Sequence, residues 1–443
     1  MAATQNLNTR KLVPLLLDWF AANARDLPWR RTRDPYAIWV SEIMLQQTQV
    51  KTVIPFWNRW LCELPTIKAA TKAPSAKIHK LWEGLGYYMR VRNLQKAAQV
   101  IMKKHGGIFP ENFNDVLALP GIGRYTAGAI CSIAFNQPTA ILDGNVIRVL
   151  TRIFGIAENP KEKQTNAQLW QLAEELVTHA ARLNLSRSSR REEAHFKIRN
   201  PKSEIRNSQS LLTSAATIEG SCSALNQSLM ELGALVCTPR NPQCLICPVK
   251  KLCVAFKENR VEELPNLGKR EAATVRRFIA FAMEHNGKFL VRQRPAGVVN
   301  AHLWEFPNVE VAAGILPDVE PGVPPGGKNS QGSRRLKIFL SPLKRARLFP
   351  GGKMPPSTAG GTPAATTLAA AAKNLGFEFR DAKPLCTVKH SITRYRITLE
   401  ALSVRLEKFP AKMEGVWKTP AQMRQLAFTS AHKKVIGSLG KRC

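Results

Sequence analysis

The chain has 443 residues, and 65 lysines and arginines against 32 aspartates and glutamates give it a net charge of +33 at pH 7. Such an excess of positive charge indicates a polyanionic partner, and the length predicts two or more domains. No apolar run is long enough to span a membrane, and residues 1–12 lack the apolar core of a signal peptide. Nine cysteines without a secretory signal indicate a reducing compartment, so we exclude a membrane protein and a secreted disulfide-rich domain.

The first elements predicted are two helices joined by a loop. Residues 12–20 have apolar side chains at helical spacing, and the loop at 25–30 (RDLPWR) ends in an aromatic and a cation. Residues 35–45 (PYAIWVSEIML) predict a buried helix in which Glu42 lies among apolar neighbours. Periodicity alone would also allow a solvent-facing Glu42. If the residue is buried, its pKa rises and it could hold a proton near neutral pH.

A short polar run follows this helix, and further helices are predicted over residues 50–118. The side chains of residues 46–49 (QQTQ) can both donate and accept hydrogen bonds, which suits the edges of DNA bases. A helix end with two glycines at 81–88 (LWEGLGYY) leads to a basic stretch that begins at Arg90.

Residues 119–130 (LPGIGRYTAGAI) predict a helix, a tight turn and a second helix. Pro120 ends the first helix, and Gly121 and Gly123 permit a turn that a Cβ atom would obstruct. The turn opens directly into the second helix, so backbone N–H groups at the helix N-terminus can bind an anion such as a DNA phosphate. A lone Gly-x-Gly would more often be an ordinary turn. Asp143 follows twenty residues after Gly123, and helices are predicted at 146–153 and 167–180.

Four cysteines within seventeen residues predict one compact metal centre. Their spacing allows either a zinc ion with four thiolate ligands or a cubane iron–sulfur cluster. Arg240, Lys250 and Lys251 lie in or beside the intervening loops and could contact phosphates. The four candidate ligands are Cys237, Cys244, Cys247 and Cys253.

These motifs together resemble the helix-hairpin-helix base-excision DNA glycosylases, and within them the MutY family of adenine DNA glycosylases. Residues 41–49 (SEIMLQQTQ), the hairpin, residues 142–145 (LDGN) and the cysteine spacing carry the resemblance. The similarity is dense over residues 10–182 and 221–256 and loose over 270–443. The resemblance implies a multi-domain fold with an all-α helix-hairpin-helix core and an iron–sulfur cluster loop, followed by a C-terminal α/β Nudix-like domain. It also implies a [4Fe–4S] cofactor.

The resemblance implies a monofunctional glycosylase that hydrolyses the N-glycosidic bond of adenine. The implied partner is double-stranded DNA with an A:8-oxoguanine or A:G mispair, bound by a monomer that is cytoplasmic and nucleoid-associated if bacterial. Glu42 would protonate adenine N7, and Asp143 would face the positive charge that develops on the sugar. Tyr125 stands where bifunctional relatives carry a lysine nucleophile, and a phenol cannot form a Schiff base. The residues implied to contact adenine or DNA are Trp29, Arg30, Leu45, Gln46, Gln47, Gly121, Gly123, Asn145, Gln227 and Thr393.

We expect residues 1–262 to form the glycosylase domain, 263–272 a linker and 273–443 the Nudix-like domain. Two segments, 184–216 and 312–362, have compositions that we interpret as disordered insertions. Asn286 and Gly287 predict the turn of a β-hairpin. The family usually has an aromatic, a hydroxyl residue and a histidine where this chain has Ile392, Thr393 and Arg394, so the opposite-base preference stays open.

Three other functions were considered. An endonuclease III-like enzyme for oxidised pyrimidines is disfavoured by Tyr125 and by the added C-terminal domain. A DNA-binding protein without catalysis is disfavoured by the presence of both Glu42 and Asp143. A Nudix hydrolase needs clustered glutamates on one helix to hold Mg²⁺, whereas the candidate helix at 367–376 has no carboxylate.

Overall fold

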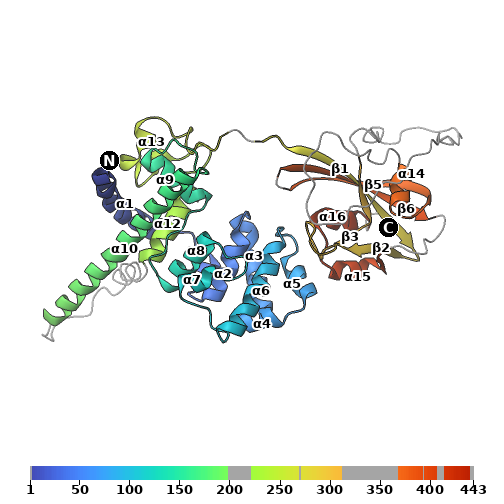
Figure 1. Cartoon of the computed structure of the whole chain (residues 1–443), viewed down its shortest axis with the longest axis horizontal. Helices are drawn as coiled ribbons and strands as arrows, with labels where there is room; N and C mark the ends of the chain where they lie inside the picture. The colour runs from blue at the N-terminus through green and yellow to red at the C-terminus, as the bar shows by residue number, and fades with distance from the viewer. Residues whose placement is uncertain are drawn as a thin grey trace. The chain divides into compact units, whose positions relative to one another are not determined.

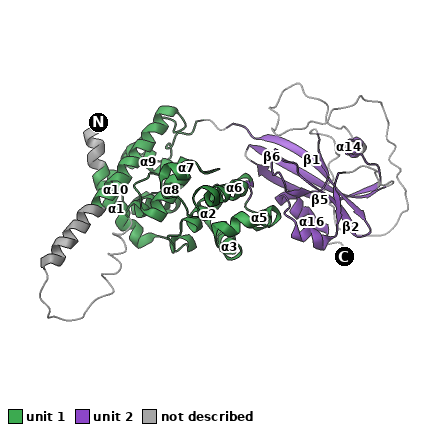
Figure 2. Ribbon diagram, turned by 60° about the horizontal axis from the view of Figure 1, so that its bottom comes forward, with its two compact units in different colours: residues 1–85, 89–270 green, residues 86–88, 271–443 purple. Residues whose placement is uncertain are grey.

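The computed structural model describes residues 2–197, 221–268, 271–311, 368–392, 394–406 and 414–439. The chain divides into two compact units, residues 1–85 with 89–270 and residues 86–88 with 271–443 (Figure 2). The segment predicted as a linker begins inside the first unit, because Leu264 is 2% exposed and packs against Ala255. No helix in the described ranges is long and apolar enough to cross a membrane.

The first unit is helical (Figure 1). Its helices are α1 (Ala2–Asn23), α2 (Pro35–Leu45), α3 (Val50–Glu63), α4 (Ile67–Lys72), α5 (Ser75–Trp82), α6 (Met89–Lys104), α7 (Phe113–Leu117), α8 (Arg124–Phe135), α9 (Gly144–Phe154), α10 (Lys163–Lys197), α12 (Ser221–Leu235) and α13 (Val254–Lys257), with 3-10 turns η1 (Pro28–Arg30), η2 (Cys244–Ile246) and η3 (Lys250–Leu252).

Helix α2 begins at a strong N-terminal signal and is buried on all sides. The Asp34 carboxylate accepts hydrogen bonds from the backbone N–H groups of Tyr36 and Ala37, and Pro35 occupies the first helical position. All residues from Tyr36 to Met44 are buried. The helix therefore carries Glu42 into the interior, as the apolar neighbours of this residue predicted.

Helices α1, α8, α9, α10 and α12 share one apolar core, with α12 packed against the other four. Gly128 on α8 sets one of the closest approaches in this core. A Cβ atom there would lie 2.1 Å from the Ala140 carbonyl oxygen. The side chains of Ser132 and Thr139 both donate to the Gly128 carbonyl oxygen, which fixes the segment after α8 against the helix.

The first part of one predicted insertion falls within a described helix. Helix α10 extends to Lys197 and so includes residues 184–197. The stretch 190–197 (RREEAHFK) contains Arg, Glu, Ala and Lys, which are strong helix formers, and helix propensity outweighs the polar composition on which the prediction relied. The remainder of this insertion, and the second insertion at 312–362, lie outside the described residues.

The second unit is a mixed β-sheet with helices. Its elements are β1 (Thr274–His285), β2 (Lys288–Gln293), β3 (Trp304–Glu305), β4 (Asn308–Val311), α14 (Leu368–Asn374), β5 (Phe379–Ile392), β6 (Tyr395–Leu406), β7 (Val416–Lys418), α15 (Pro420–Gln425) and α16 (Ser430–Leu439). In the described part of this unit the strand order is β3-β2-β1-β6-β5, with β4 also paired to β1 and β7 to β2. Strands β1 and β6 are parallel.

Both faces of this sheet are covered, so the unit is an α/β fold as predicted. Along β1 the side chains alternate: Ala280 and Ala282 join a core with α15 and α16, whereas Phe281 joins a core with α14. The predicted hairpin is confirmed, because His285 pairs with Lys288 across a turn in which Asn286 and Gly287 both have positive φ.

Replacing Gly128 by alanine should destabilise the first unit by about 1–3 kcal/mol, because the new methyl group must displace the Ala140 backbone. Thermal or urea unfolding of the full-length protein would measure the loss. Gly437→Ala on α16 is the matched control, since its Cβ atom would meet nothing within 4 Å. Equal stability of the two variants would contradict this account of the core.

Candidate active site

Glu42 lies in the interior of the first unit, where Tyr125 of α8 contacts it. Its side chain accepts a hydrogen bond of 2.9 Å from the Tyr125 hydroxyl, which is also 3.4 Å from the Met230 sulfur atom of α12. Glu42 is 4% exposed, and its pKa is raised to about 7; burial is the main cause and Asp143 adds to it, whereas the Tyr125 hydrogen bond and Arg30 oppose it. A carboxyl group in this state carries a proton for part of the time at neutral pH and can give it to a bound base.

Asp143 is the N-cap of α9. One carboxylate oxygen accepts a 2.7 Å hydrogen bond from the Val146 N–H, and the other accepts a 3.0 Å bond from the Asn145 side-chain amide. Burial raises the pKa of Asp143, but both hydrogen bonds and the nearby Arg148 act in the opposite direction. Burial thus raises the pKa of both acids, but Asp143 has more donors that favour its carboxylate form than Glu42 has.

A buried ion-pair network lies beside these acids and contains Arg30 and Gln227, two of the predicted pocket residues. The Arg30 guanidinium donates to the Gln227 side-chain carbonyl at 3.0 Å and to both oxygens of Glu231 at 3.0–3.1 Å. Arg25 donates to the same carboxylate. Burial alone would raise the pKa of Glu231, but these two arginines lower it to about 2, so the group stays ionised.

The remaining predicted pocket residues differ in how deeply they are buried. Trp29 is 6% exposed and packs edge-on against Trp57, so it belongs to the core around the site. Leu45 and Gln46 are half-buried at the end of α2, where the Gln46 amide donates to the Thr126 hydroxyl at 3.3 Å. Gln47 is exposed and has a φ of 57°, an uncommon backbone conformation for a residue with a Cβ atom.

The predicted hairpin turn is present before α8. Gly121 has a φ of 78°, and a Cβ atom there would lie 2.5 Å from the Asn93 Cβ atom, so only glycine suits both the conformation and the contact. Gly123 is the N-cap of α8, and no side chain caps the N-terminus of this helix. Its first N–H groups therefore retain the capacity to bind a phosphate.

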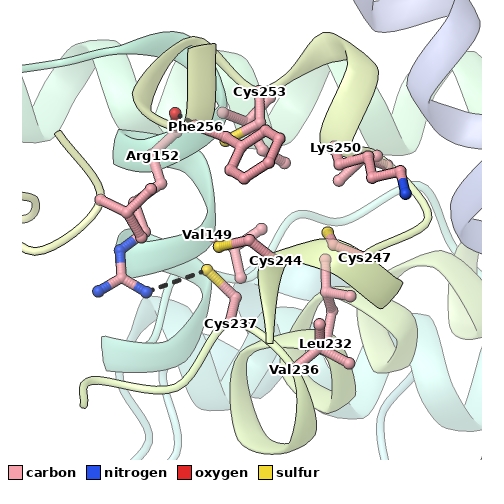
Figure 3. A pocket seen from close by; sticks show the side chains of 13 residues that line it. Val149, Arg152, Leu232, Val236, Cys237, Cys244, Cys247, Lys250, Cys253 and Phe256 are labelled. Atoms are coloured by element: carbon pink, nitrogen blue, oxygen red, sulfur yellow. Dashed lines mark hydrogen bonds between the residues drawn. The ribbon is translucent and has the colours of Figure 1, made fainter. Parts of the chain in front are cut away.

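The four predicted cysteine ligands line one cavity between α9, α12 and the loop that contains η2 and η3 (Figure 3). Among the described residues no group of three or more His, Cys, Asp or Glu is arranged as a single-ion site. The chemistry around the cavity nevertheless fits an anionic cluster. Arg152 is 2% exposed, has no carboxylate partner in the described chain, and donates to the Cys237 sulfur at 3.3 Å. Bound thiolates would supply its missing counter-charge.

A chain of hydrogen bonds joins the cysteine loop to Asp143. Asn145, which donates to Asp143, accepts a 2.8 Å bond from Arg148. Arg148 in turn donates to the Cys237 carbonyl oxygen at 2.7 Å and to the Gly233 carbonyl oxygen at 2.7 Å. A Cβ atom at Gly233 would lie 2.7 Å from the Asn145 Cβ atom, so the glycine allows this close approach. Asn145 therefore holds the Asp143 carboxylate in place and is itself held by Arg148.

Sequence reasoning missed several residues of this region. Glu231 lies four residues after Gln227 and so on the same face of α12, a spacing that could have identified it. No spacing or motif in the sequence identifies Met230 or Arg25 as part of this region. In the second unit, Thr393 lies outside the described residues, while its neighbour Arg394 is exposed with its guanidinium 5.4 Å from the centre of the Tyr395 ring.

Comparison with protein families agrees with both motifs. Residues 40–175 match the HhH-GPD superfamily of base excision DNA repair proteins, and residues 237–253 match the iron–sulfur binding domain of endonuclease III. The cysteines therefore form an endonuclease III-type site that implies a [4Fe–4S] cluster. Zinc, the other ligand that the spacing allowed, is not supported.

Individual relatives extend this agreement. The adenine DNA glycosylase of Buchnera aphidicola subsp. Acyrthosiphon pisum is 35% identical over 296 residues, which are 66% of this chain and 73% of that protein. The human adenine DNA glycosylase is 40% identical over 258 residues, 56% of this chain and 40% of that protein. Among solved structures, the C-terminal domain of mouse MUTYH, in complex with human PCNA, matches 39% of this chain and 89% of its own length at 19% identity and a TM-score of 0.22. The two adenine DNA glycosylases carry the assignment. The chain therefore belongs to the adenine DNA glycosylases (MutY) of the HhH-GPD superfamily, hydrolases of base excision repair.

Proposed function

We propose that this protein is a monofunctional glycosylase that hydrolyses the N-glycosidic bond of adenine mispaired with 8-oxoguanine or guanine in double-stranded DNA. The observation that carries the proposal is the pairing of a protonatable Glu42 with a donor-held Asp143. In this reaction water adds to the sugar C1′, the C1′–N9 bond breaks, and adenine leaves with an added proton. The target adenine must first leave the base stack to reach these groups.

The two acids divide the reaction between them. Protonation of adenine N7 by Glu42 makes the base a better leaving group. The Asp143 carboxylate then faces a sugar with oxocarbenium character, and its charge is fixed by the Val146 N–H and the Asn145 amide before the reaction starts. Tyr125 holds Glu42 and offers no amine for a Schiff base, which supports hydrolysis without strand cleavage.

The adenine-binding part of the site is proposed to include Arg30, Leu45, Gln46, Gln47 and Gln227. The Gln227 amide accepts from Arg30 and donates to the Ser223 hydroxyl, both at 3.0 Å, so its orientation is set before adenine enters. Trp29 packs against Trp57 in the core behind these residues. Gly121 and Gly123 present the N-terminus of α8 to a phosphate.

When bound, the [4Fe–4S] cluster would be held by the four cysteines and would fix the loop that carries Arg240, Lys250 and Lys251. We propose that this role is structural. We further propose a monomer that is cytoplasmic and nucleoid-associated if the host is bacterial. An endonuclease III-like activity remains the second candidate, although Tyr125 offers no amine for its lyase step.

Glu42→Gln should lower single-turnover adenine release by at least about 10²-fold while duplex affinity changes by only a few fold, because an amide cannot serve as the acid. The active form is protonated, so the wild-type rate should fall as pH rises through about 7, the pKa of Glu42. The variant should lose this dependence.

Glu63→Gln is the matched control, because Glu63 is an exposed carboxylate paired with Lys77. It should keep the wild-type rate and pH profile. An unchanged rate in Glu42→Gln would remove Glu42 from the mechanism. Release of oxidised pyrimidines but not of adenine would instead favour the endonuclease III-like candidate.

The turn between β5 and β6 is proposed to contact the base opposite adenine. Thr393→Val and Arg394→Met in the full-length protein should each narrow the preference for A:8-oxoguanine over A:G, by about 1–3 kcal/mol per lost base contact. Lys389→Met on β5 removes an exposed charge nearby and should leave the preference unchanged. If Thr393→Val and Arg394→Met keep the wild-type preference, as the control should, this turn does not read the base.

A further inference from the structure

Arg90, at the start of α6, is turned into the protein although its neighbours in the sequence suggested a surface basic stretch. One guanidinium nitrogen donates to the carbonyl oxygens of Ile43 at 2.8 Å and Met44 at 3.1 Å, and to that of Gln46. The other nitrogen donates to the Leu85 carbonyl oxygen at 3.1 Å. One planar side chain thus joins the C-terminal end of the catalytic helix α2 to the turn that follows α5.

The two segments that Arg90 joins share an unusual backbone. Gln47, next to Gln46, has a φ of 57°, and Tyr87, two residues after Leu85, has a φ of 48°. Residues with a Cβ atom adopt such conformations only where the surroundings enforce them, and such residues cluster at functional sites. Both side chains are exposed, with Tyr87 at 44%. Bonds from one guanidinium to both segments are a physical means of enforcing this geometry.

The polar run after α2 and the start of α6 lie beside the hairpin turn that precedes α8. Gln46, Met89 and Arg90 line one cavity together with Pro120 and Gly121 of the hairpin turn. Helix α2 also packs against both α6 and α8 (Figure 1). The polar run after α2 and the start of α6 therefore border the surface that the hairpin offers to a phosphate.

We propose that Arg90 is a positioning residue that clamps residues 46–48 to the turn at Leu85, so that the polar run after α2 meets the duplex already ordered and drives the target adenine out of the stack. This inference rests on the proposed function, because it concerns adenine within a mispair. Extrusion costs unstacking and unpairing energy. Segments that are already ordered lose less conformational entropy on binding, so more of the binding free energy can offset the cost of extrusion.

The clamp depends on the shape of the guanidinium and not only on its charge. Its two terminal nitrogens diverge in one plane, which lets them reach carbonyl oxygens on different segments. A lysine ammonium would keep the positive charge at the end of α2, which is favourable there, but it would bond one segment at a time. Arg90→Lys should therefore show most of the defect of Arg90→Met.

The test compares adenine release from two duplexes, one with adenine opposite guanine and one with adenine opposite an abasic-site analogue. Unpaired adenine costs less to extrude, so Arg90→Met should lose at least about tenfold more rate on the A:G duplex than on the abasic duplex, the size of one lost hydrogen bond to a charged group. A smaller fraction of active protein, or a disturbed Glu42, would lower the rate of adenine release equally on both duplexes. Arg92→Met removes the same charge from the same helix. It should lower the rate of adenine release from both duplexes by the same factor.

Hydrogen exchange on the protein without DNA tests the clamp independently of catalysis. The Thr48 and Leu85 N–H groups bond to the Leu45 and Trp82 carbonyl oxygens in the two clamped segments. Both should exchange faster in Arg90→Met and Arg90→Lys, and neither in Arg92→Met. Unchanged exchange, or equal rate losses on the two duplexes, would overturn the proposal. Failure of the wild-type protein to release adenine from either duplex would instead refute the proposed function.

Discussion

The burial of Glu42 is the constraint on which the first unit depends. A carboxylate removed from water loses hydration that a single hydrogen bond from Tyr125 replaces only in part, so the group holds a proton to about neutral pH. This state requires a helix that excludes water on every side and does not rotate. The structure supplies that restraint at both ends of α2, through the Asp34 cap at its start and the Arg90 bonds at its end.

The same requirement explains why the cysteine loop lies where it does. Asp143 is useful only if its carboxylate is fixed, and its partner Asn145 is fixed by Arg148. Arg148 is itself held by the Cys237 carbonyl oxygen, on the loop that a cluster would make rigid. A cluster bound to that loop would therefore stabilise the geometry of Asp143 from a distance.

The sequence predicted the parts of the site that are coded locally. The apolar neighbours of Glu42, the Gly121 turn, the position of Asp143 after the hairpin and the cysteine spacing are each read from a short stretch of sequence. Glu231 and Arg90 were missed because their partners are distant: Arg25 and Arg30 lie about 200 positions from Glu231, and Ile43 lies 47 positions from Arg90. The helical extension of α10 was missed for the opposite reason, since local propensity there outweighed a polar composition. Local patterns thus identify chemical groups, while tertiary contacts decide which of them are held rigid.

Part of the large positive charge of the chain serves the structure of the first unit. Composition alone assigned the excess of lysine and arginine to contacts with DNA. Yet Arg30, Arg90, Arg148 and Arg152 donate to protein carbonyl oxygens or carboxylates inside the first unit and form its framework. Because these guanidinium groups already donate to protein acceptors, they should contribute little to counterion release on DNA binding. The salt dependence of binding therefore reports the exposed cations only, at roughly 0.9 in logarithmic slope for each phosphate contact, and the net charge of the chain overstates it.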